Sequence, residues 1–519
     1  MAALSFTNTA HEEVTERLGG APGETHFIGT LDSFFFRYVL RPFGSAVEFP
    51  RQGARLIPAP QANALHEPQV KTGGGQADFA CLYSLRISGG TEDAPDMWVK
   101  KKKLNGAFGK QALASFNKDY RQTGRVSHAG VNYLAAKILD GAHGAKVSRL
   151  LAVRFPVLLV DEFQDTGYFA GRALRRLVQN SGIRCLIVGD PDQAIFKFGG
   201  ASGQLFADME GIKGACARSL VESHRCPERV ARVAAHLSRT NKGVTPARID
   251  SVGEARLIVY DQNRPNPETL IQAVGWSGPK TTVLVRNNTT LRTMLGNPTR
   301  SPKGNSVAVN IDRAVSLLLR GDSSGAAKQL AAILGNVILD KPILGREELE
   351  GFTIAELSWK IAVRRVLFEA ARVRSADESW NLWLGRVRTR IAGEAECLGH
   401  PVVKTGIKVR AVDKQFGDQA RVAPMESHAF GGLGTVHSAK GREYPFVLLV
   451  VPKPHKTQHP CPSDEWWNPD DTSEEMETAF VACSRAQKGL AIAVHRQTYE
   501  ALVAKRKGFV DLFDVVESQ

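Results

Sequence analysis

Acidic side chains follow directly after two short, wholly apolar segments of the sequence. Residues 157–160 (VLLV) run into Asp161 and Glu162, and residues 186–188 (LIV) are followed by a glycine and Asp190. A carboxylate at the end of a strand can hold Mg²⁺, often with waters kept around the ion. A neighbouring carboxylate can polarise a water for attack on a phosphoryl group. The string DEFQDT that begins at Asp161 therefore favours such a site, although adjacent acids also occur in ordinary loops.

The stretch after Asp190 adds an amide and two aromatic rings. Gln193 follows three residues beyond the aspartate, where its amide can hydrogen-bond a phosphate or an attacking water. Phe196 and Phe198 come next on a glycine-rich loop. Exposed rings on a loop would suit stacking on bases, at about 1–3 kcal/mol per base. The same spacing is equally compatible with two core residues.

Two segments nearer the C-terminus carry further polar groups. A turn with His437, Lys440 and Glu443 precedes the apolar run 447–451. Arg485 follows a stretch with one small or apolar helical face and comes just before another apolar run. An arginine placed between two lobes can neutralise charge on a transferring phosphoryl group. A single arginine is nevertheless more often a surface cation.

Five short runs are apolar throughout, which is what buried strands of a helix-covered parallel sheet require. They are residues 157–160, 186–188, 283–285, 447–451 and 490–494. Ligands of such sheets bind beyond the carboxyl ends of the strands, where these polar residues fall. The pattern predicts an α/β fold with covered parallel sheets. Plain core strands would leave the recurring acids unexplained.

Two stretches differ from this pattern of strands and acids. Residues 45–125 are rich in Gly, Pro and Gln and contain four consecutive lysines. Residues 291–430 are rich in Arg and mostly helical in pattern. We interpret both as insertions into two α/β lobes. The first lobe would comprise residues 1–44 and 126–222, and the second lobe residues 223–290 and 431–519.

The composition is that of a globular protein with a basic surface. The 519 residues are 43% hydrophobic and 23% charged, and 67 Lys and Arg against 53 Asp and Glu give a net charge of +14. This excess of positive charge favours a polyanionic partner, and it favours nucleic acid more than an anionic membrane. No run approaches the roughly 20 apolar residues that cross a bilayer, and the N-terminus has no secretion signal. Seven scattered cysteines form no zinc motif. These features predict a cytoplasmic protein without a membrane partner.

The order of the motifs resembles the UvrD/Rep group of superfamily 1 DNA helicases. The strings are SFTN, DEFQDT, GDPDQAIFKFGGA, ESHRC, VLVRNN, GTVHSAKGREY and EEMETAFVACSRA, which together span Ser5 to about Val494. The resemblance implies two RecA-like parallel-sheet lobes (a P-loop NTPase fold), with ATP and Mg²⁺ as cofactors. It implies DNA as the partner, both single-stranded and at junctions of single and double strands. It also implies ATP-driven movement 3′ to 5′, with the insertions as accessory subdomains.

The resemblance assigns roles to individual residues. In the first lobe, Asp161 would bind Mg²⁺, Glu162 would be the catalytic base and Gln193 would sense the γ-phosphate. In the second lobe, Arg225 and Arg485 would contact phosphate. His224 would lie near the nucleotide, and Glu443 would bind near the ribose or triphosphate. Phe6, Thr7, Phe198 and His437 would line the path of single-stranded DNA. The lysine run 100–103 would either meet DNA phosphates or remain a solvated loop.

The chain departs from the family pattern at one major point and three minor ones. No G-x-x-x-x-G-K-[ST] string occurs in the 519 residues. The family pattern has this phosphate-binding loop before the SFTN segment, so that part of the pattern is not matched. Gly199, His224 and Asp32 stand where the family usually has an arginine, a tyrosine and a histidine. Without the loop we expect weak nucleotide binding and negligible ATP hydrolysis by the chain as given.

Three explanations of the missing loop are compatible with the sequence. The chain would be a truncated or misassigned reading frame of an ordinary helicase, one part of a split enzyme that receives the loop from another chain, or a nucleotide-independent DNA-binding or scaffold protein. The six predicted nucleotide-site residues favour the first, because a protein freed from hydrolysis has little physical need to keep them all. Gly199 modestly favours the third.

Overall fold

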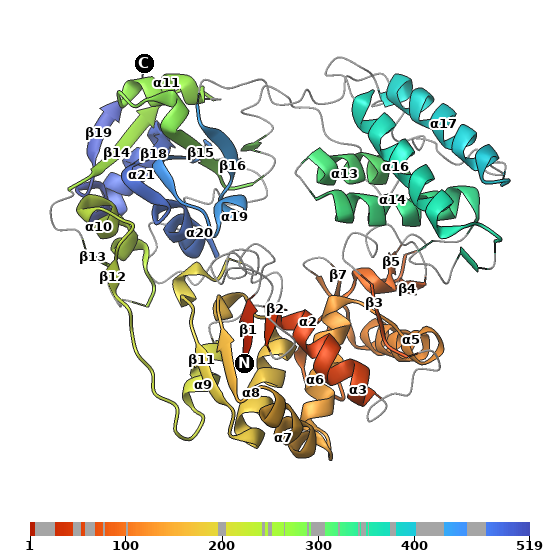
Figure 1. Cartoon of the computed structure of the whole chain (residues 1–519). Coiled ribbons are helices and arrows are strands. Elements are labelled where there is room, and N and C mark those ends of the chain that lie inside the picture. Colours follow the sequence, from red (N-terminus) through yellow and green to blue (C-terminus); the bar gives the residue numbers. More distant parts are fainter. Residues whose placement is uncertain are drawn as a thin grey trace.

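The computed structural model contains two α/β lobes and two further groups of elements (Figure 1). The structure describes residues 1–5, 26–44, 53–57, 68–75, 78–99, 102–195, 204–240, 244–247, 252–263, 265–287, 290–291, 307–319, 322–340, 343, 349–350, 352–373, 380–400, 430–453 and 474–518. Within these ranges, no helix is long and apolar enough to span a lipid bilayer.

The sheet of the first lobe has four parallel strands in the order β11, β10, β1 and β2. Their bounds are Arg184–Ile187, Val157–Val160, Ala2–Ser5 and Phe27–Thr30. β1 pairs with β10 and β2, and β10 also pairs with β11. Because all strands run in one direction, the acidic residues after β10 and β11 lie at the same edge of the sheet.

Helices pack on one face of this sheet and form the core of the lobe. They are α2 (Leu31–Phe35), η1 (Phe36–Leu40), α3 (Arg41–Phe43), α6 (His128–Asp140), α7 (Gly144–Arg154), α8 (Tyr168–Ser181) and α9 (Gln204–Glu210). Ala2, Leu4, Leu158 and Val160 belong to this core and are 0%, 2%, 0% and 3% exposed. The alternation of their positions follows from the two-residue repeat of a strand.

The described part of residues 45–125, which we interpret as an insertion, packs on the core of the first lobe. It contains β3 (Arg55–Leu56), β4 (Gln69–Lys71), β5 (Phe79–Cys81), η3 (Leu82–Ser84), β6 (Arg86–Gly90), β7 (Pro95–Val99), β8 (Lys102–Lys103) and α5 (Gly106–Thr123). β3 pairs with β9 (Arg125–Val126), and Phe116 of α5 packs in the same cluster as Phe34. Lys102 and Lys103 of the predicted basic run are exposed, and the other two lysines lie outside the described residues.

The sheet of the second lobe has six parallel strands. In order they are β16 (Gly432–Thr435), β15 (Thr281–Val285), β17 (Tyr444–Val450), β18 (Ala486–His495), β14 (Glu254–Tyr260) and β19 (Asp514–Glu517). All five residues of β15 are buried, because one hydrophobic cluster covers each face of this sheet. A strand buried on both faces must be apolar throughout, which explains the continuous runs in the sequence.

Helices cover both faces of the second sheet. The elements are α10 (Glu228–Leu237), α11 (Pro267–Ala273), η7 (Gly278–Lys280), α19 (Val436–Ala439), α20 (Glu474–Cys483), α21 (Arg496–Lys505) and α22 (Lys507–Val510). β12 (Glu222–Ser223) precedes α10 in the chain, and β13 (Thr245–Pro246) follows it. These two short strands pair with each other in parallel. Arg225 lies between β12 and α10, and Arg485 lies between α20 and β18.

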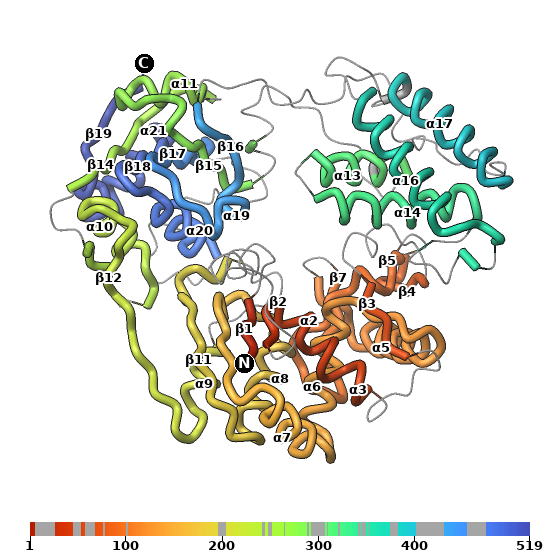
Figure 2. Tube along the Cα trace, viewed as in Figure 1, coloured from red at the N-terminus to blue at the C-terminus, as the bar shows by residue number. Residues whose placement is uncertain are grey.

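A separate group of helices lies between β15 and β16 in the chain. It consists of α13 (Val307–Leu319), α14 (Ser323–Ile338), α16 (Glu356–Arg372) and α17 (Trp380–Cys397). The helices bury a cluster of their own that includes Ile311, Leu330, Val366 and Trp383. Figure 2 shows this group as a body apart from both sheets. The helical pattern of the sequence between 291 and 430 therefore corresponds to an independent core.

Candidate nucleotide site between the lobes

The loop after β10 carries two acidic residues at the carboxyl end of the first sheet. The Asp161 N–H donates to the Leu4 carbonyl at 2.9 Å, which keeps the start of this loop attached to β1. Asp161 is exposed, whereas Glu162 is half-buried and has a left-handed backbone with φ of 52°. This conformation costs a non-glycine residue about 1–3 kcal/mol and persists only where the surroundings hold it. Glu162 is therefore a candidate functional position on structural grounds as well.

The buried side chain of Gln164 holds the two strand ends together. Its Nε2 donates to a carboxylate oxygen of Glu162, and its Oε1 accepts from the Asp190 N–H at 3.0 Å. A Cβ on Gly189 would lie 2.4 Å from Gln164 Oε1, so this close approach requires glycine. The sequence pattern alone indicates no separate role for Gln164. The feature that marks Gln164 as a site residue is the burial of its polar side chain within the DEFQDT string.

The turn η5 (Pro191–Gln193) presents Gln193 from the first lobe. Asp190 accepts from the Asp192 N–H at 3.0 Å, and its other oxygen accepts from Gln193 Nε2 at 2.7 Å. Burial raises the pKa of Asp190, while the hydrogen bond from Gln193 lowers it. Because Asp190 holds Nε2, the Oε1 atom of Gln193 can accept a hydrogen bond from the other lobe.

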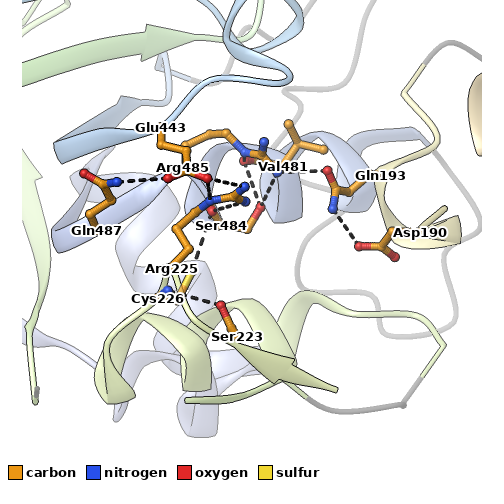
Figure 3. Close-up of polar contacts among 10 residues, drawn as sticks. All are labelled: Asp190, Gln193, Ser223, Arg225, Cys226, Glu443, Val481, Ser484, Arg485 and Gln487. Carbon is orange, nitrogen blue, oxygen red and sulfur yellow. Dashed lines mark hydrogen bonds and ion pairs between the residues drawn. The ribbon is translucent and has the colours of Figure 1, made fainter. Parts of the chain in front are cut away.

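Arg485 reaches from the second lobe to Gln193 (Figure 3). Its Nη2 donates to Gln193 Oε1 at 2.8 Å and to Ser484 Oγ at 3.1 Å, and its Nε donates to the Val481 carbonyl at 3.1 Å. Arg485 is 2% exposed, and burial together with the charge of Arg225 lowers its pKa to about 10. Arg485 therefore remains cationic at neutral pH in a buried position.

The helix α20 fixes the position of Arg485. Residues 476–483 of this helix are all buried, and acidic residues occupy its first turn, where the helix dipole favours them. Glu475 accepts from Arg286 Nε at 2.7 Å, and Glu477 accepts from Arg239 Nη1 at 3.2 Å. Two arginines from different parts of the second lobe thus hold the beginning of the helix whose end carries Arg485.

A second arginine of the second lobe is paired with a carboxylate. Arg225 Nε donates to Glu443 Oε1 at 2.7 Å, and Arg225 Nη1 donates to the Ser484 carbonyl at 3.3 Å. Gln487 Nε2 donates to the other oxygen of Glu443 at 2.9 Å. Burial raises the pKa of Glu443, but the hydrogen bond and charge of Arg225 and the amide of Gln487 bring it below its ordinary value. Glu443 is therefore ionised and orients Arg225 beside Arg485.

Lys440 forms an ion pair across the two lobes. Its Nζ lies 2.6 Å from Asp165 Oδ2 and donates to the Gln193 carbonyl at 2.6 Å. Burial raises the pKa of Asp165 to about 6, although the charge of Lys440 lowers it. The sequence places Lys440 on a turn but indicates no role for it, because the partner carboxylate belongs to the other lobe. This contact ties the DEFQDT string to the loop before β17.

A second polar connection joins η5 to the end of α10. Buried Asp192 accepts from the Ser238 hydroxyl at 2.5 Å, the Thr240 hydroxyl at 2.7 Å and the Arg239 N–H at 3.0 Å. Ile195, two residues after η5, belongs to the hydrophobic core of the second lobe. The segment that carries Gln193 is therefore held by both lobes.

Replacing Lys440 with methionine is expected to destabilise the protein, because it leaves the nearly buried Asp165 carboxylate without its cation. Removing one partner of a buried pair costs about 3–5 kcal/mol. Urea unfolding followed by tryptophan fluorescence measures the loss. Lys488→Met, which changes an exposed lysine of the same lobe, should have no such effect. Adding Asp165→Asn to Lys440→Met should recover part of the loss, since no buried charge then remains.

The effect of Lys440→Met should also depend on pH. The pKa of Asp165 is raised from 3.8 to about 6 in the folded protein, so its contribution to stability is present below 3.8 and is lost as pH rises through about 6. Without Lys440 this pKa rises further, and the loss extends to higher pH. The deficit of the variant should thus be small near about pH 5 and large near about pH 8. A deficit independent of pH would contradict the assignment.

The predicted DNA-contacting residues are only partly within the described residues. Phe6, Thr7 and Phe198 lie outside them, as do Phe196 and Gly199. His437 lies on α19, and its Nε2 is 3.1 Å from the Ile195 carbonyl. The structure therefore places His437 beside the segment held by both lobes.

Two of the positions that depart from the family pattern lie in the described part of the chain. His224 is exposed next to Arg225. Asp32 Oδ2 lies 3.0 Å from His128 Nδ1, and Asp32 Oδ1 accepts from Asn132 Nδ2 at 2.8 Å. Asp32, which stands where the family usually has a histidine, therefore has a histidine and an asparagine of α6 as polar partners.

The arrangement suits Mg²⁺ that arrives with a triphosphate. Mg²⁺ is usually bound by one or two carboxylates together with substrate phosphates. Asp161 and Glu162 supply carboxylates, and Arg225 and Arg485 supply cations from the other lobe. Among the described residues, no group of three or more His, Cys, Asp and Glu side chains could hold a metal ion by itself. These residues fit the phosphate end of a nucleotide with its ion.

The two lobes with parallel sheets are consistent with the RecA-like fold of helicases. The family model described as the UvrD/REP helicase N-terminal domain matches residues 1–211. The model described as the UvrD-like helicase C-terminal domain matches residues 432–497. The chain belongs to the UvrD/Rep-like helicases of superfamily 1.

One curated relative is similar over a short stretch. The RecBCD enzyme subunit RecB of Escherichia coli (strain K12) is 38% identical over 87 residues, which is 17% of this chain and 7% of RecB. The chain thus aligns with only a small part of that protein. At the level of the family, the two matches are to helicase domains. UvrD-like helicases generally use ATP and Mg²⁺.

Proposed function

We propose that this protein is an ATP-dependent DNA helicase and translocase that moves 3′ to 5′ along one strand. The observation that carries the proposal is the 2.8 Å contact between Arg485 of the second lobe and Gln193 of the first. Both side chains can donate hydrogen bonds to phosphate oxygens. A phosphate group placed between the lobes would therefore replace this contact. Nucleotide binding would then be coupled to the relative position of the lobes.

Each residue of the site has a proposed part in hydrolysis. Glu162 takes the proton from the attacking water, and Gln193 orients that water or the terminal phosphate. Arg485 and Arg225 neutralise the charge that develops on the phosphate oxygens. Asp161 would hold Mg²⁺, which would add charge neutralisation.

The remaining residues of the proposal concern nucleotide and DNA. Glu443 orients Arg225 near the ribose or triphosphate, with His224 beside it. His437 lines the DNA path together with Phe6, Thr7 and Phe198, which we propose from the family resemblance. The net charge of +14 supports a polyanionic partner.

A phosphate-binding loop must complete this site before hydrolysis is efficient. The 519 residues contain no G-x-x-x-x-G-K-[ST] string, whose backbone N–H groups and lysine would cradle the phosphates. We propose that such a loop is supplied by another segment of polypeptide. The chain together with a segment that carries this string is called the complemented protein below.

Steady-state ATP hydrolysis with and without single-stranded DNA tests the proposal. We expect negligible hydrolysis by the 519-residue chain, and DNA-stimulated hydrolysis when a phosphate-loop segment of a UvrD/Rep-like helicase is fused ahead of Met1. Duplexes with a 3′ or a 5′ single-stranded tail test the direction of movement, and only the 3′-tailed duplex should be unwound. Robust hydrolysis by the 519-residue chain would contradict the role of the loop, and unwinding from the 5′ tail would contradict the direction.

The missing string also supports a second candidate, a nucleotide-independent single-stranded-DNA-binding or scaffold subunit. Fluorescence anisotropy with a labelled single strand distinguishes the two. If the complemented protein binds DNA with an affinity that Mg-ATP does not change, and never hydrolyses ATP, the second candidate replaces the first.

A further inference from the structure

The short turn η5 carries a buried carboxylate that is bound by the second lobe. Asp192 is 5% exposed. Its Oδ2 accepts from the hydroxyls of Ser238 and Thr240, and its Oδ1 accepts from the N–H groups of Arg239 at 3.0 Å and Thr240 at 3.2 Å. These donors follow directly after α10, whose apolar side chains belong to the core of the second lobe. A carboxylate has about four lone-pair sites, so the four donors occupy it fully.

The residues that follow Asp192 are attached to the same lobe. The Gln193 carbonyl accepts from Lys440 Nζ at 2.6 Å. Ile195 is fully buried in the core of the second lobe, and its carbonyl lies 3.1 Å from His437 Nε2. The segment 192–195 therefore packs as a part of the second lobe, although β11 before it and α9 after it in the chain pack in the first lobe.

The residues before Pro191 are attached to the first lobe. β11 pairs with β10 in the first sheet, and the Asp190 N–H donates to Gln164 Oε1 at 3.0 Å. Asp190 Oδ2 also accepts from Gln193 Nε2 at 2.7 Å, so the Gln193 side chain keeps a contact with this lobe (Figure 3). The chain thus passes from one lobe to the other within the GDPDQ string, at Pro191.

We infer that Asp192 is a positioning residue that attaches Gln193 to the second lobe. When the lobes separate, Gln193 moves with Arg485 and away from the loop that carries Glu162. The second lobe holds the turn through four hydrogen bonds to the Asp192 carboxylate, whereas the first lobe holds the Gln193 side chain through Asp190. That Gln193 acts on a water or a phosphate rests on the proposed function, but its attachment to the second lobe does not.

This attachment divides the proposed catalytic site between the lobes in a particular way. The first lobe contributes the carboxylates of Asp161 and Glu162, and the second lobe contributes Gln193 together with its arginines. A ligand that displaces Arg485 from Gln193 leaves the contacts of Asp192 in place, so Gln193 stays aligned with the second lobe. Because its four donors occupy Asp192, this carboxylate acts through Gln193 and touches no reacting atom.

The alternative is that Asp190 holds the turn on the first lobe and that Asp192 merely contacts the second. Hydrogen exchange of the Arg239 and Thr240 amides in the 519-residue chain decides between the two, because both amides donate to Asp192. We expect Asp192→Ala to speed their exchange at least about tenfold and Asp190→Ala to leave it unchanged. Equal acceleration in both variants, or fast exchange of the two amides in the wild-type chain, would overturn the inference.

Two further variants keep the exchange experiment interpretable. Asp192→Asn can still accept from the two N–H groups through its oxygen and can donate to the hydroxyls through its amide, so it should restore most of the protection. Asp511→Ala removes an exposed carboxylate of the same lobe and should leave exchange unchanged. If thermal unfolding shows that Asp192→Ala does not fold, Ser238→Ala combined with Thr240→Val removes the hydroxyl donors instead. Unchanged exchange in that double variant would contradict the attachment.

Turnover of the complemented protein tests the positioning role. Displacement of Gln193 in Asp192→Ala should lower kcat about 10- to 100-fold and leave the KM for ATP nearly unchanged. Asp192→Ala combined with Gln193→Ala should be no slower than Gln193→Ala alone, because Asp192 acts through Gln193. Asp192→Asn should recover most of the rate. Normal kcat in Asp192→Ala, or losses that simply add in the double variant, would refute the positioning role.

Failure of this inference and failure of the proposed function give different results. If the complemented wild-type protein does not hydrolyse ATP but the Arg239 and Thr240 amides respond as expected, the attachment of Gln193 to the second lobe stands and the helicase proposal fails. If the complemented wild-type protein hydrolyses ATP but Asp190→Ala and Asp192→Ala speed exchange equally, the inference is wrong and the proposed function stands.

Discussion

Replacing Arg485 with alanine is expected to lower ATP hydrolysis by the complemented protein by roughly 10³- to 10⁵-fold, the range for an arginine that stabilises phosphoryl transfer. The guanidinium is 2% exposed and donates to Gln193 on the opposite lobe. Its pKa of about 10 leaves it charged at neutral pH. A buried cation acts more strongly on a transferring phosphate than one in water, because less solvent screens it. Steady-state turnover with saturating single-stranded DNA measures the effect.

Arg485→Lys separates charge from geometry. Lysine keeps the positive charge but cannot hold both the Val481 carbonyl and Gln193 through a planar group. We therefore expect it to recover only a small part of the lost rate. Arg496→Ala removes a half-buried arginine of the same lobe that pairs with Asp261 and Glu517, and should leave turnover unchanged. An Arg485→Ala protein with turnover within tenfold of the wild type would place this residue outside the catalytic machinery.

Replacing Glu162 with glutamine is expected to abolish measurable hydrolysis and to leave DNA binding intact. General bases contribute about 10²- to 10⁴-fold, and glutamine has nearly the same shape but cannot take a proton. The substitution preserves the backbone at φ of 52° and allows an amide contact with Gln164. The loss should therefore lie in the chemical step and not in folding.

The controls for Glu162→Gln follow from its surroundings. Glu210→Gln alters an exposed carboxylate at the end of α9 in the same lobe and should hydrolyse ATP normally. Anisotropy with a labelled single strand should give the same affinity for wild type and both variants. Normal hydrolysis by Glu162→Gln would show that another group, such as Asp161, takes the proton.

The contacts between the lobes form one connected set. Gln193 accepts from Arg485 through its side chain and from Lys440 through its carbonyl, and Lys440 also pairs with Asp165. A ligand that displaces Arg485 from Gln193 would therefore act on a segment that Lys440 also holds. This is a physical route by which phosphate binding could change the relative position of the lobes.

The strands of both sheets were largely predictable from the sequence. A strand buried in a parallel sheet must be apolar along its whole length, and the runs 157–160, 283–285 and 447–451 carry this signal locally. The run 186–188 gave the same signal, but among the described strands β11 pairs with β10 alone. A sequence pattern records the environment for which a strand is suited and not whether its neighbour is present.

The site was predictable as a set of residue types and not as a set of contacts. Glu162, Gln193, Arg225, Glu443 and Arg485 were singled out from their motifs, and the structure brings them to one region, while their roles remain proposals. Gln164 and Lys440 were missed as site residues because what distinguishes them is the burial of their side chains, which only the structure shows. Asp192 was missed for the same reason, since four donors from Ser238, Arg239 and Thr240 of the second lobe surround it.

The sequence by itself determined the α/β class, the order of the motifs and the excess of positive charge. These properties are local or additive, since a strand end, a turn or a net charge is written in consecutive residues or in a sum. Only the tertiary structure decided which groups meet. Arg225 and Glu443 are 218 residues apart, Lys440 and Asp165 are 275 apart, and Arg485 and Gln193 are 292 apart. Such pairs form because two separately folded sheets present their strand ends to each other, and no local pattern encodes that approach.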